Sequence, residues 1–191
     1  MSLVARVIRT LARISRVCFY RSISTVKPEG KFCSVAPVLC EGKGCVTVGD
    51  GTIFGFIEDA DFWTSYEFLN PRNADSKISI GKNCKICNRF TAVSEGDGIE
   101  MGDNVLVGSS VTVLDSDFHE IDPEKRVGGT PKTGKVFVGD NVWIGDRVMI
   151  LKGSSIGKNS IVAAGAVVSG AFPPNVIIGG IPAKVIREIG G

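Results

Sequence analysis

An aliphatic side chain returns at every sixth residue through much of the chain, and this spacing limits the possible folds more than any other feature. Neither the 3.6-residue period of a helix nor the two-residue period of a strand explains it. Glycine or another small residue often follows the aliphatic one. The series consists of Val48 and Phe54; Ile80, Ile86 and Ala92; Met101, Val107 and Val113; and Val138, Ile144, Ile150, Ile156, Val162 and Val168.

The six-residue repeat predicts a solenoid. Short strands separated by turns would point one aliphatic side chain per face into a triangular prism, and three hexads would complete one coil. Successive coils would pair through backbone hydrogen bonds, so that free strand edges remain only at the two ends. The high glycine content, 24 of 191 residues, suits a fold with many tight turns.

The repeat also divides the chain. We expect a helix and linker over residues 1–29, the solenoid over residues 30–172 and a tail over residues 173–191. The repeat is interrupted by insertions at about 56–77 and 114–137. Because each interruption falls in the third hexad of its coil, we expect the insertions to stack along one edge of the prism, where loops that carry function are commonly found.

The two insertions differ in content. The first carries Phe62, Trp63 and Tyr66, which have three possible partners: a sugar ring, the prism or the N-terminal helix. The second carries His119, the one histidine of the chain. A metal site built from several histidines of one chain is therefore excluded.

Residues 1 to about 20 fit an amphipathic helix. Its arginines recur on one face, and an apolar stripe lies opposite. The apolar side is predicted to pack on its own domain or on a sister subunit; the alternatives are an interfacial helix on anionic lipid, and a mitochondrial presequence. The arginines are Arg6, Arg9, Arg13 and Arg16, and the stripe contains Leu3, Val4, Val7, Ile8, Leu11, Ile14 and Cys18.

Charge and cysteine usage exclude further classes. The 22 basic and 20 acidic side chains nearly cancel, which argues against nucleic acid as a partner. With no convincing secretory signal, the six cysteines indicate a reduced, cytoplasmic protein, associated with the cytoplasmic membrane face if the helix binds lipid. Cys84 and Cys87 form a CxxC motif without a second pair, so we interpret them as core residues.

Four segments carry a family resemblance. The segments 138–145 (VGDNVWIG) and 156–162 (IGKNSIV) resemble the hexapeptide-repeat acyltransferases, and 173–187 resembles the end of the maltose and galactoside O-acetyltransferases. The segment 115–122 (DSDFHEID) is similar to the histidine loop of sugar acetyltransferases from surface-polysaccharide pathways. The resemblance implies an all-β fold, a left-handed parallel β-helix, assembled as a homotrimer with acetyl-CoA and a sugar or glycan acceptor bound between subunits.

The resemblance also implies a reaction, transfer of an acetyl group from acetyl-CoA to a sugar hydroxyl. His119 would be the general base, because neutral imidazole accepts a proton near pH 7. Asp115, Asp117 and Glu120 are close enough in sequence to orient its ring, and we favour Asp117. The motif assigns the amide of Asp146 to the oxyanion that forms on the thioester carbonyl.

Other positions match the family's binding residues. Asn88 and Asp115 are the candidates for acceptor binding, and no metal is expected. Two alternatives remain open: an N-acetyltransferase that acts on an amino sugar, and a non-catalytic trimeric scaffold. The candidates for coenzyme A binding are Trp143 near the reacting centre, Ala164 and Ser169 along the pantetheine, and Lys184 and Arg187 at the phosphates.

Overall fold

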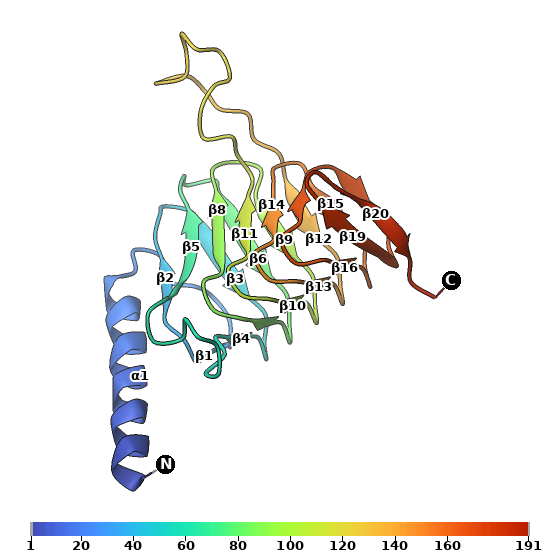
Figure 1. The fold of residues 1–191 in the computed structure, drawn as a ribbon. Helices are drawn as coiled ribbons and strands as arrows, with labels where there is room; N and C mark the ends of the chain where they lie inside the picture. Colours follow the sequence, from blue (N-terminus) through green and yellow to red (C-terminus); the bar gives the residue numbers. More distant parts are fainter. Residues whose placement is uncertain (1, 191) are drawn as a thin grey trace.

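The computed structural model describes residues 2–190. Helix α1 (Leu3–Ile23) is followed by short strands that coil around a common axis, so that the chain visits three sheets in turn (Figure 1). Neighbouring strands within each sheet are parallel, apart from the antiparallel pair at the C-terminal end of the first sheet.

The three sheets form the sides of a prism. The first contains β1 (Cys33–Ser34), β4 (Ile53–Phe54), β7 (Lys85–Ile86), β10 (Leu106–Val107), β13 (Trp143–Ile144), β16 (Ile161–Val162), β19 (Val176–Gly180) and β20 (Ala183–Glu188). The second contains β2 (Val38–Cys40), β5 (Glu67–Pro71), β8 (Thr91–Ser94), β11 (Thr112–Leu114), β14 (Met149–Ile150) and β17 (Val167–Val168). The third contains β3 (Cys45–Val48), β6 (Lys77–Ile80), β9 (Ile99–Met101), β12 (Val136–Val138), β15 (Ser155–Ile156) and β18 (Ala171–Phe172).

The hexad residues form the core. Every aliphatic or aromatic member of the predicted series is buried, which confirms that the repeat points inward. The members also stack in register: Ile86, Val107 and Ile144 lie on consecutive strands of the first sheet. Stacking of like side chains at each level fills the narrow interior without large rings.

The turns at one edge depend on asparagine. Asn83, Asn104, Asn141, Asn159 and Asn175 adopt left-handed backbone conformations, with φ between 55° and 61°. Asparagine tolerates this region better than other residues with a Cβ. The side chains also form a ladder, in which the Nδ2 of Asn141 donates to the Oδ1 of Asn159 at 3.0 Å and the Nδ2 of Asn159 donates to Asn175 at 2.9 Å.

The prediction that all insertions share one edge is wrong for the first of them. Strand β5 lies inside the expected insertion 56–77 and pairs with β2 and β8. The insertion is therefore residues 55–66, between the first and second sheets, whereas the His119 insertion lies between the second and third. The inward positions of β5 are Glu67, Leu69 and Pro71, so only one aliphatic residue marks this hexad.

Helix α1 is present, but its orientation is the reverse of the one expected for packing on its own domain. The arginine side contacts the body: Arg16 donates to the backbone oxygens of Phe62 and Ser65, and the guanidinium of Arg9 lies 5.1 Å from the ring centroid of Trp63. The ring of Tyr20 stacks on Tyr66 at 4.8 Å. The aromatic insertion thus packs against the helix.

The cysteines are all unpaired thiols. Cys84 is buried, as predicted, while Cys87 is half-buried and faces a groove described below. Within residues 2–190, no helix combines the length and the apolar character needed to cross a bilayer.

Candidate functional site

A groove of about 570 Å³ lies on the outer face of the first sheet, beside β13. We call it the Trp143 groove; the indole is 54% exposed and lines it together with Phe56, Leu106, Cys87 and Asp146. Burial raises the pKa of the Cys87 thiol, and the carboxylates of Asp59 and Asp146 raise it further. The thiol is therefore protonated near neutral pH and is a poor nucleophile.

The backbone amide of Asp146 is open at this groove because the corresponding residue of the next coil carries no acceptor. One coil earlier, the amide of Ser109 donates to the Oδ1 of Asp146 at 2.9 Å. The next residue in this column is Ala164, since Ile144 pairs with Val162, and its methyl group cannot accept. Among residues 2–190, the Asp146 amide has no acceptor.

Gly108 makes this arrangement possible. A Cβ at Gly108 would lie 2.4 Å from the Oδ1 of Asp146 and 2.7 Å from its amide nitrogen. Both contacts are closer than real Cβ atoms allow, so a side chain here would displace Asp146. The absence of a side chain at Gly108 therefore determines where the open amide lies.

The insertion 55–66 forms one wall of the Trp143 groove, and buried contacts hold it. Asn88 is fully buried; its Oδ1 accepts from the amide of Phe56 at 3.0 Å, and its Nδ2 donates to the oxygen of Phe56 at 2.9 Å. Asp59 accepts a hydrogen bond from Ser109, and Arg89 pairs with Asp61 at 3.2 Å. Because the oxygen and the nitrogen of its side-chain amide are both hydrogen-bonded to Phe56, Asn88 holds the wall in place. It is therefore not available for its predicted role of binding an acceptor substrate.

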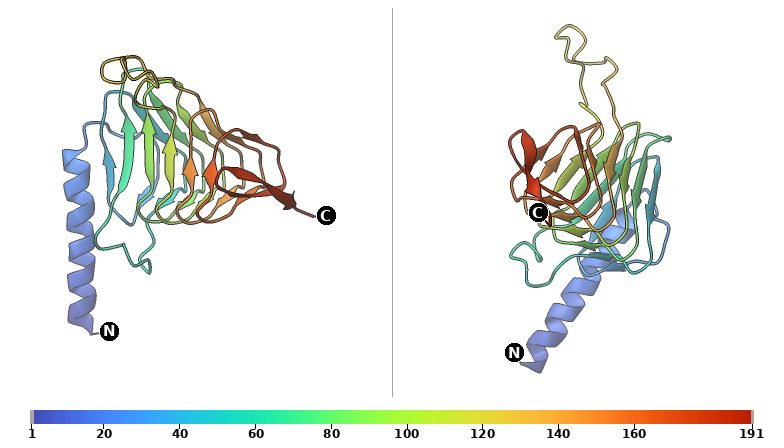
Figure 2. Two further views of the ribbon diagram at one scale, coloured as in Figure 1. Left: turned by 45° about the horizontal axis from the view of Figure 1, so that its top comes forward. Right: turned by 90° about the vertical axis from the view of Figure 1, so that its right-hand side faces the viewer.

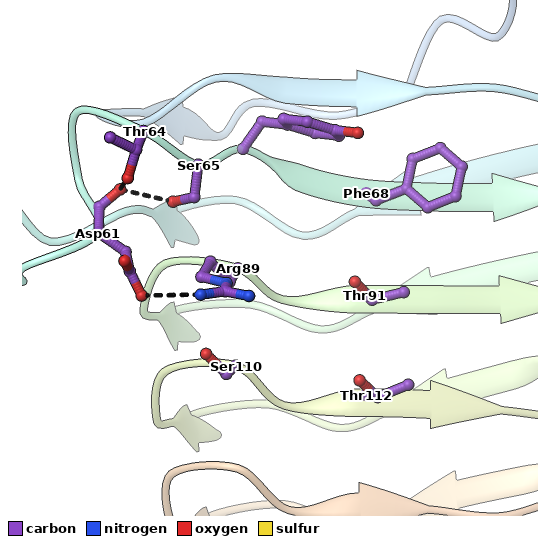
Figure 3. Close-up of a pocket in the computed structure, with 9 residues that line it drawn as sticks. Asp61, Thr64, Ser65, Phe68, Arg89, Thr91, Ser110 and Thr112 are labelled. Carbon is purple, nitrogen blue, oxygen red and sulfur yellow. Dashed lines mark hydrogen bonds and ion pairs between the residues drawn. The ribbon is translucent and has the colours of Figure 1, made fainter.

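A second groove, also of about 570 Å³, lies on the other side of this insertion (Figure 3). Phe68, Thr91 and Thr112 follow one another on successive strands of the second sheet, and Arg89 and Ser110 lie at the turns beside them. The lining is mostly polar. The insertion therefore separates a polar groove from the apolar Trp143 groove.

Glu67 is a buried carboxyl group next to this wall. Its pKa is raised to about 8, chiefly by burial and to a smaller extent by the carboxylate of Asp59, although the hydrogen bond from the amide of Phe90 lowers it. Its Oε1 has no partner among the described residues. Glu67 is therefore largely protonated at pH 7 and introduces no charge into the edge.

His119 lies on the insertion between β11 and β12, which projects away from the prism (Figure 1). The start of this insertion is anchored to the prism. Phe118, with φ 61°, places its ring 4.6 Å from the guanidinium of Arg72, and the Phe118 amide donates to the Oγ of Ser116 at 2.9 Å. Arg72 also pairs with Glu95 at 3.6 Å. The residue preceding the histidine is thus held in place although the loop is exposed.

The partner of the imidazole is a backbone carbonyl. The Nδ1 of His119 lies 3.0 Å from the oxygen of Arg126. Because a carbonyl only accepts, Nδ1 carries the proton in this contact, and the Nε2 of the neutral ring is free to accept one. Asp117, the predicted orienting residue, instead pairs with Lys152 at 3.4 Å. Among residues 2–190, no acidic side chain forms an ion pair with His119.

Asp115 is an internal tie. Its carboxylate is fully buried and accepts from the Oγ of Ser94 at 2.7 Å and from the amides of Glu95, Gly96 and Gly98 at 2.7–3.3 Å. Four donors satisfy a carboxylate. The carboxylate of Asp115 therefore does not make the expected contact with an acceptor substrate. It has a structural role instead, because it closes the turn before β9.

The predicted residues for coenzyme A are exposed, but they do not all lie together. Ala164 follows β16 at the same edge as Asp146, and the amide of Gly165 donates to the oxygen of Asp146 at 2.8 Å. Ser169 lies between β17 and β18, at the edge that carries His119. Lys184 and Arg187 lie on β20, opposite Gly179 and Ile177 of β19.

Apart from Lys184 and Arg187 on β20, the predicted site residues therefore fall into two groups at two edges of the prism. Trp143, Asp146 and Ala164 lie along the edge between the first and second sheets, and His119 and Ser169 lie along the edge between the second and third. A single chain does not bring the two groups together. Within residues 2–190, no cluster of three or more His, Cys, Asp or Glu side chains has the arrangement of a metal site.

Sequence reasoning missed several features of these edges. The contact between His119 and the Arg126 carbonyl could not be predicted from residue types, because every residue carries a backbone oxygen. The contribution of Phe56 to the apolar wall was not predicted, because β5 was not recognised as a strand and the insertion was assigned to another edge. The missing acceptor at Ala164 could have been noticed in the sequence, because the positions one and three coils earlier hold Asp146 and Asn88, whose side chains can accept.

The chain is similar in sequence to known proteins. Residues 135–170 match the family model "Bacterial transferase hexapeptide (six repeats)". The chain is 40% identical over 114 residues to the galactoside O-acetyltransferase of Escherichia coli, covering 60% of this chain and 55% of that protein. It is 39% identical over 100 residues to the same enzyme of Lactococcus lactis, covering 52% and 47%. The chain thus spans about half the length of these relatives.

The fold is also shared with a solved structure. The hexapeptide-repeat acetyltransferase of Vibrio cholerae, complexed with acetyl coenzyme A, superposes with a TM-score of 0.53 at 23% identity, covering 93% of this chain and 78% of that one. Taken with the coil geometry, these matches show that the chain carries the bacterial transferase hexapeptide repeat and resembles the sugar O-acetyltransferases in sequence.

Proposed function

We propose that this protein transfers the acetyl group of acetyl-CoA to a hydroxyl group of a sugar or glycan precursor. The observation that carries the proposal is the open amide of Asp146 at the Trp143 groove, where Ala164 of the next coil supplies no acceptor. An unpaired amide beside an apolar wall suits a carbonyl oxygen that gains charge. The names of the galactoside O-acetyltransferases support a sugar hydroxyl as the acceptor.

In this mechanism His119 acts as the general base. Its Nε2 removes the proton of the acceptor hydroxyl while the oxygen attacks the thioester carbonyl, and the hydrogen bond from Nδ1 to the Arg126 oxygen holds the ring. The amide of Asp146 donates to the oxyanion of the tetrahedral intermediate. The C–S bond then breaks, and the imidazolium returns the proton to the thiolate, so the products are an acetyl ester and free coenzyme A.

The site is proposed to be shared between two copies of the chain. A base and an oxyanion donor that act on one carbonyl must lie within a few ångströms of it. The two groups of residues lie at different edges of one prism. A homotrimer of left-handed β-helices would bring the His119 edge of one subunit against the Asp146 edge of the next, forming three equivalent sites.

The same arrangement would bind the coenzyme along the interface. Ala164 and Ser169, both small and exposed, would flank the pantetheine from neighbouring subunits. Lys184 and Arg187, exposed on β20, would contact the phosphates, for which cationic side chains are natural partners. The Vibrio cholerae neighbour, whose structure contains acetyl coenzyme A, supports this choice of donor.

The experiment is a turnover assay with acetyl-CoA and a panel of nucleotide sugars and lipid-linked glycans. The proposal predicts free thiol release that depends on one class of acceptor, and a product whose acetyl group is removed by mild base, as an ester is. A base-resistant product would identify an amine acceptor and overturn the hydroxyl assignment. Absence of acetyl-CoA binding by calorimetry would leave only a scaffold.

A further inference from the structure

Helix α1 lies at the N-terminal end of the prism and extends past it (Figure 2), and the large hydrophobic side chains of its apolar stripe are exposed. Val4, Val7, Leu11, Ile14 and Cys18 recur at alternating spacings of three and four, so they lie on one side. The large hydrophobic side chains from Leu3 to Ile14 are between 48% and 76% exposed, and no residue of the helix is buried. A contiguous apolar surface of this kind usually marks an interaction site.

The body fixes which side of the helix faces outward. Arg16 donates to two backbone oxygens of the insertion 55–66, Arg9 lies over Trp63, and Tyr20 stacks on Tyr66. These contacts all come from the side opposite the stripe. Turning the stripe towards the body would break these contacts. The contacts that attach the helix therefore keep the stripe exposed.

The charge of the segment indicates what covers the stripe. Residues 2–31 contain seven of the 22 basic side chains and one of the 20 acidic ones, so the remaining 15 basic and 19 acidic side chains leave the rest of the chain net negative. Helix α1 itself contains five arginines and no acidic residue. An apolar stripe on a strongly cationic helix is the pattern that binds anionic lipid surfaces.

We propose that α1 docks the protein on an anionic lipid bilayer, with the stripe buried at the level of the headgroups. A second copy of the same helix fits less well, because pairing two stripes would bring two strongly cationic segments together. The insertion 55–66 contacts α1 and also supplies Phe56 to the Trp143 groove. Docking would therefore hold this groove at a defined position near the membrane. The inference does not depend on acetyl transfer.

The test is flotation of the full-length protein with vesicles of phosphatidylcholine containing 30% phosphatidylglycerol, compared with pure phosphatidylcholine. Leu11→Glu places a charge at the centre of the stripe, at a side chain that is 62% exposed and contributes little to folding. Loss of one buried leucine and gain of a carboxylate should lower partitioning about tenfold or more. Val127→Glu, at a residue that is 92% exposed on the distant loop, is the matched control.

The proposal predicts that the wild type and Val127→Glu float with the anionic vesicles, that Leu11→Glu does not, and that high salt weakens the binding. Equal binding to both kinds of vesicle would overturn the anionic requirement. No flotation of the wild type would overturn docking altogether. If, in addition, Leu11→Glu reduced the size of the assembly by light scattering, the stripe would be a contact between copies of this chain. Circular dichroism confirms that each variant is folded.

Discussion

The two edges that hold the predicted site residues are built in different ways. At the edge between the first and second sheets, Asp146 belongs to the repeat itself, and coil-to-coil hydrogen bonds fix its position. At the edge between the second and third sheets, His119 lies on an exposed insertion that is anchored mainly at its base. In the proposed mechanism these two constructions have different roles: the rigid edge would supply the fixed backbone dipole, and the projecting loop would supply the proton acceptor.

The largest effect is expected from the loop. His119→Ala should lower acetyl transfer about 10²–10⁴-fold, the range typical of a general base. Because the side chain is exposed, folding and assembly should be unchanged. Turnover with a true acceptor, together with light scattering and acetyl-CoA binding, measures both. Nearly full turnover in the variant would assign the base to another group.

The next effect tests the rigid edge. Ala164→Asp restores an acceptor in the column, so that its carboxylate takes the Asp146 amide and adds negative charge beside the oxyanion. Loss of one such donor costs about 10²–10³-fold in rate. Lys158→Asp is the matched control, because it places a carboxylate beside the Asp140 amide, in the same kind of column at the edge between the third and first sheets. Equal activity of the two variants would contradict the assignment of Asp146.

A smaller effect is expected where the donor's phosphates would bind. Lys184→Ala and Arg187→Ala should each raise the KM for acetyl-CoA about tenfold, a magnitude typical of a charged hydrogen bond. The value of kcat should change little, because these contacts lie far from the reacting carbon and hold the ground and transition states alike. Steady-state kinetics at saturating acceptor separates the two parameters. A fall in kcat at constant KM would move these residues into the reacting centre.

The smallest effect on activity is expected from Glu67→Gln, which tests how the rigid edge is stabilised. With a folded pKa of about 8 and an ordinary value of 4.5, Glu67 binds a proton more tightly when folded. The tighter proton binding of Glu67 contributes to the free energy of unfolding; this contribution is fully present below pH 4.5 and is lost as the pH rises towards 8. Glutamine keeps the acceptor for the Phe90 amide without the charge. The variant should therefore be more stable than the wild type at pH 8, by up to about 4 kcal/mol.

Urea unfolding at pH 5 and at pH 8 checks this difference. The gain in the free energy of unfolding should shrink at the lower pH, because most of the wild-type carboxyl group is then protonated in the folded state. An equal gain at both values would show that Glu67 is ionised in the folded protein or that the variant acts through packing.

The sequence predicted the repetitive part of the molecule well, because one aliphatic side chain per hexad is a local and redundant signal. Members of one series, such as Val138 and Ile144, mark two sheets without any knowledge of distant contacts. The signal failed at β5, where Glu67 and Pro71 occupy inward positions. An insertion was consequently assigned to the wrong edge.

The contacts of the candidate site were harder to predict than its residues. The motif located His119, but its ring partner is a backbone oxygen, and Asp115 next to it is saturated by buried donors. The orientation of helix α1 was equally hard to predict. Its sequence pattern distinguishes an arginine face from an apolar face, but only the contacts of Arg16 and Tyr20 show which of them faces the body. Such choices depend on tertiary partners far apart in the chain.

The central claim, that each site combines the His119 edge of one chain with the Asp146 edge of another, is tested most directly by subunit mixing. His119→Ala and Ala164→Asp are each expected to be inactive, and a trimer assembled from both contains sites in which neither defect is present. Random equimolar assembly should restore about a quarter of the wild-type rate, since each of two independent contributions is intact half of the time. Activity no greater than that of the two separate variants would contradict a shared site.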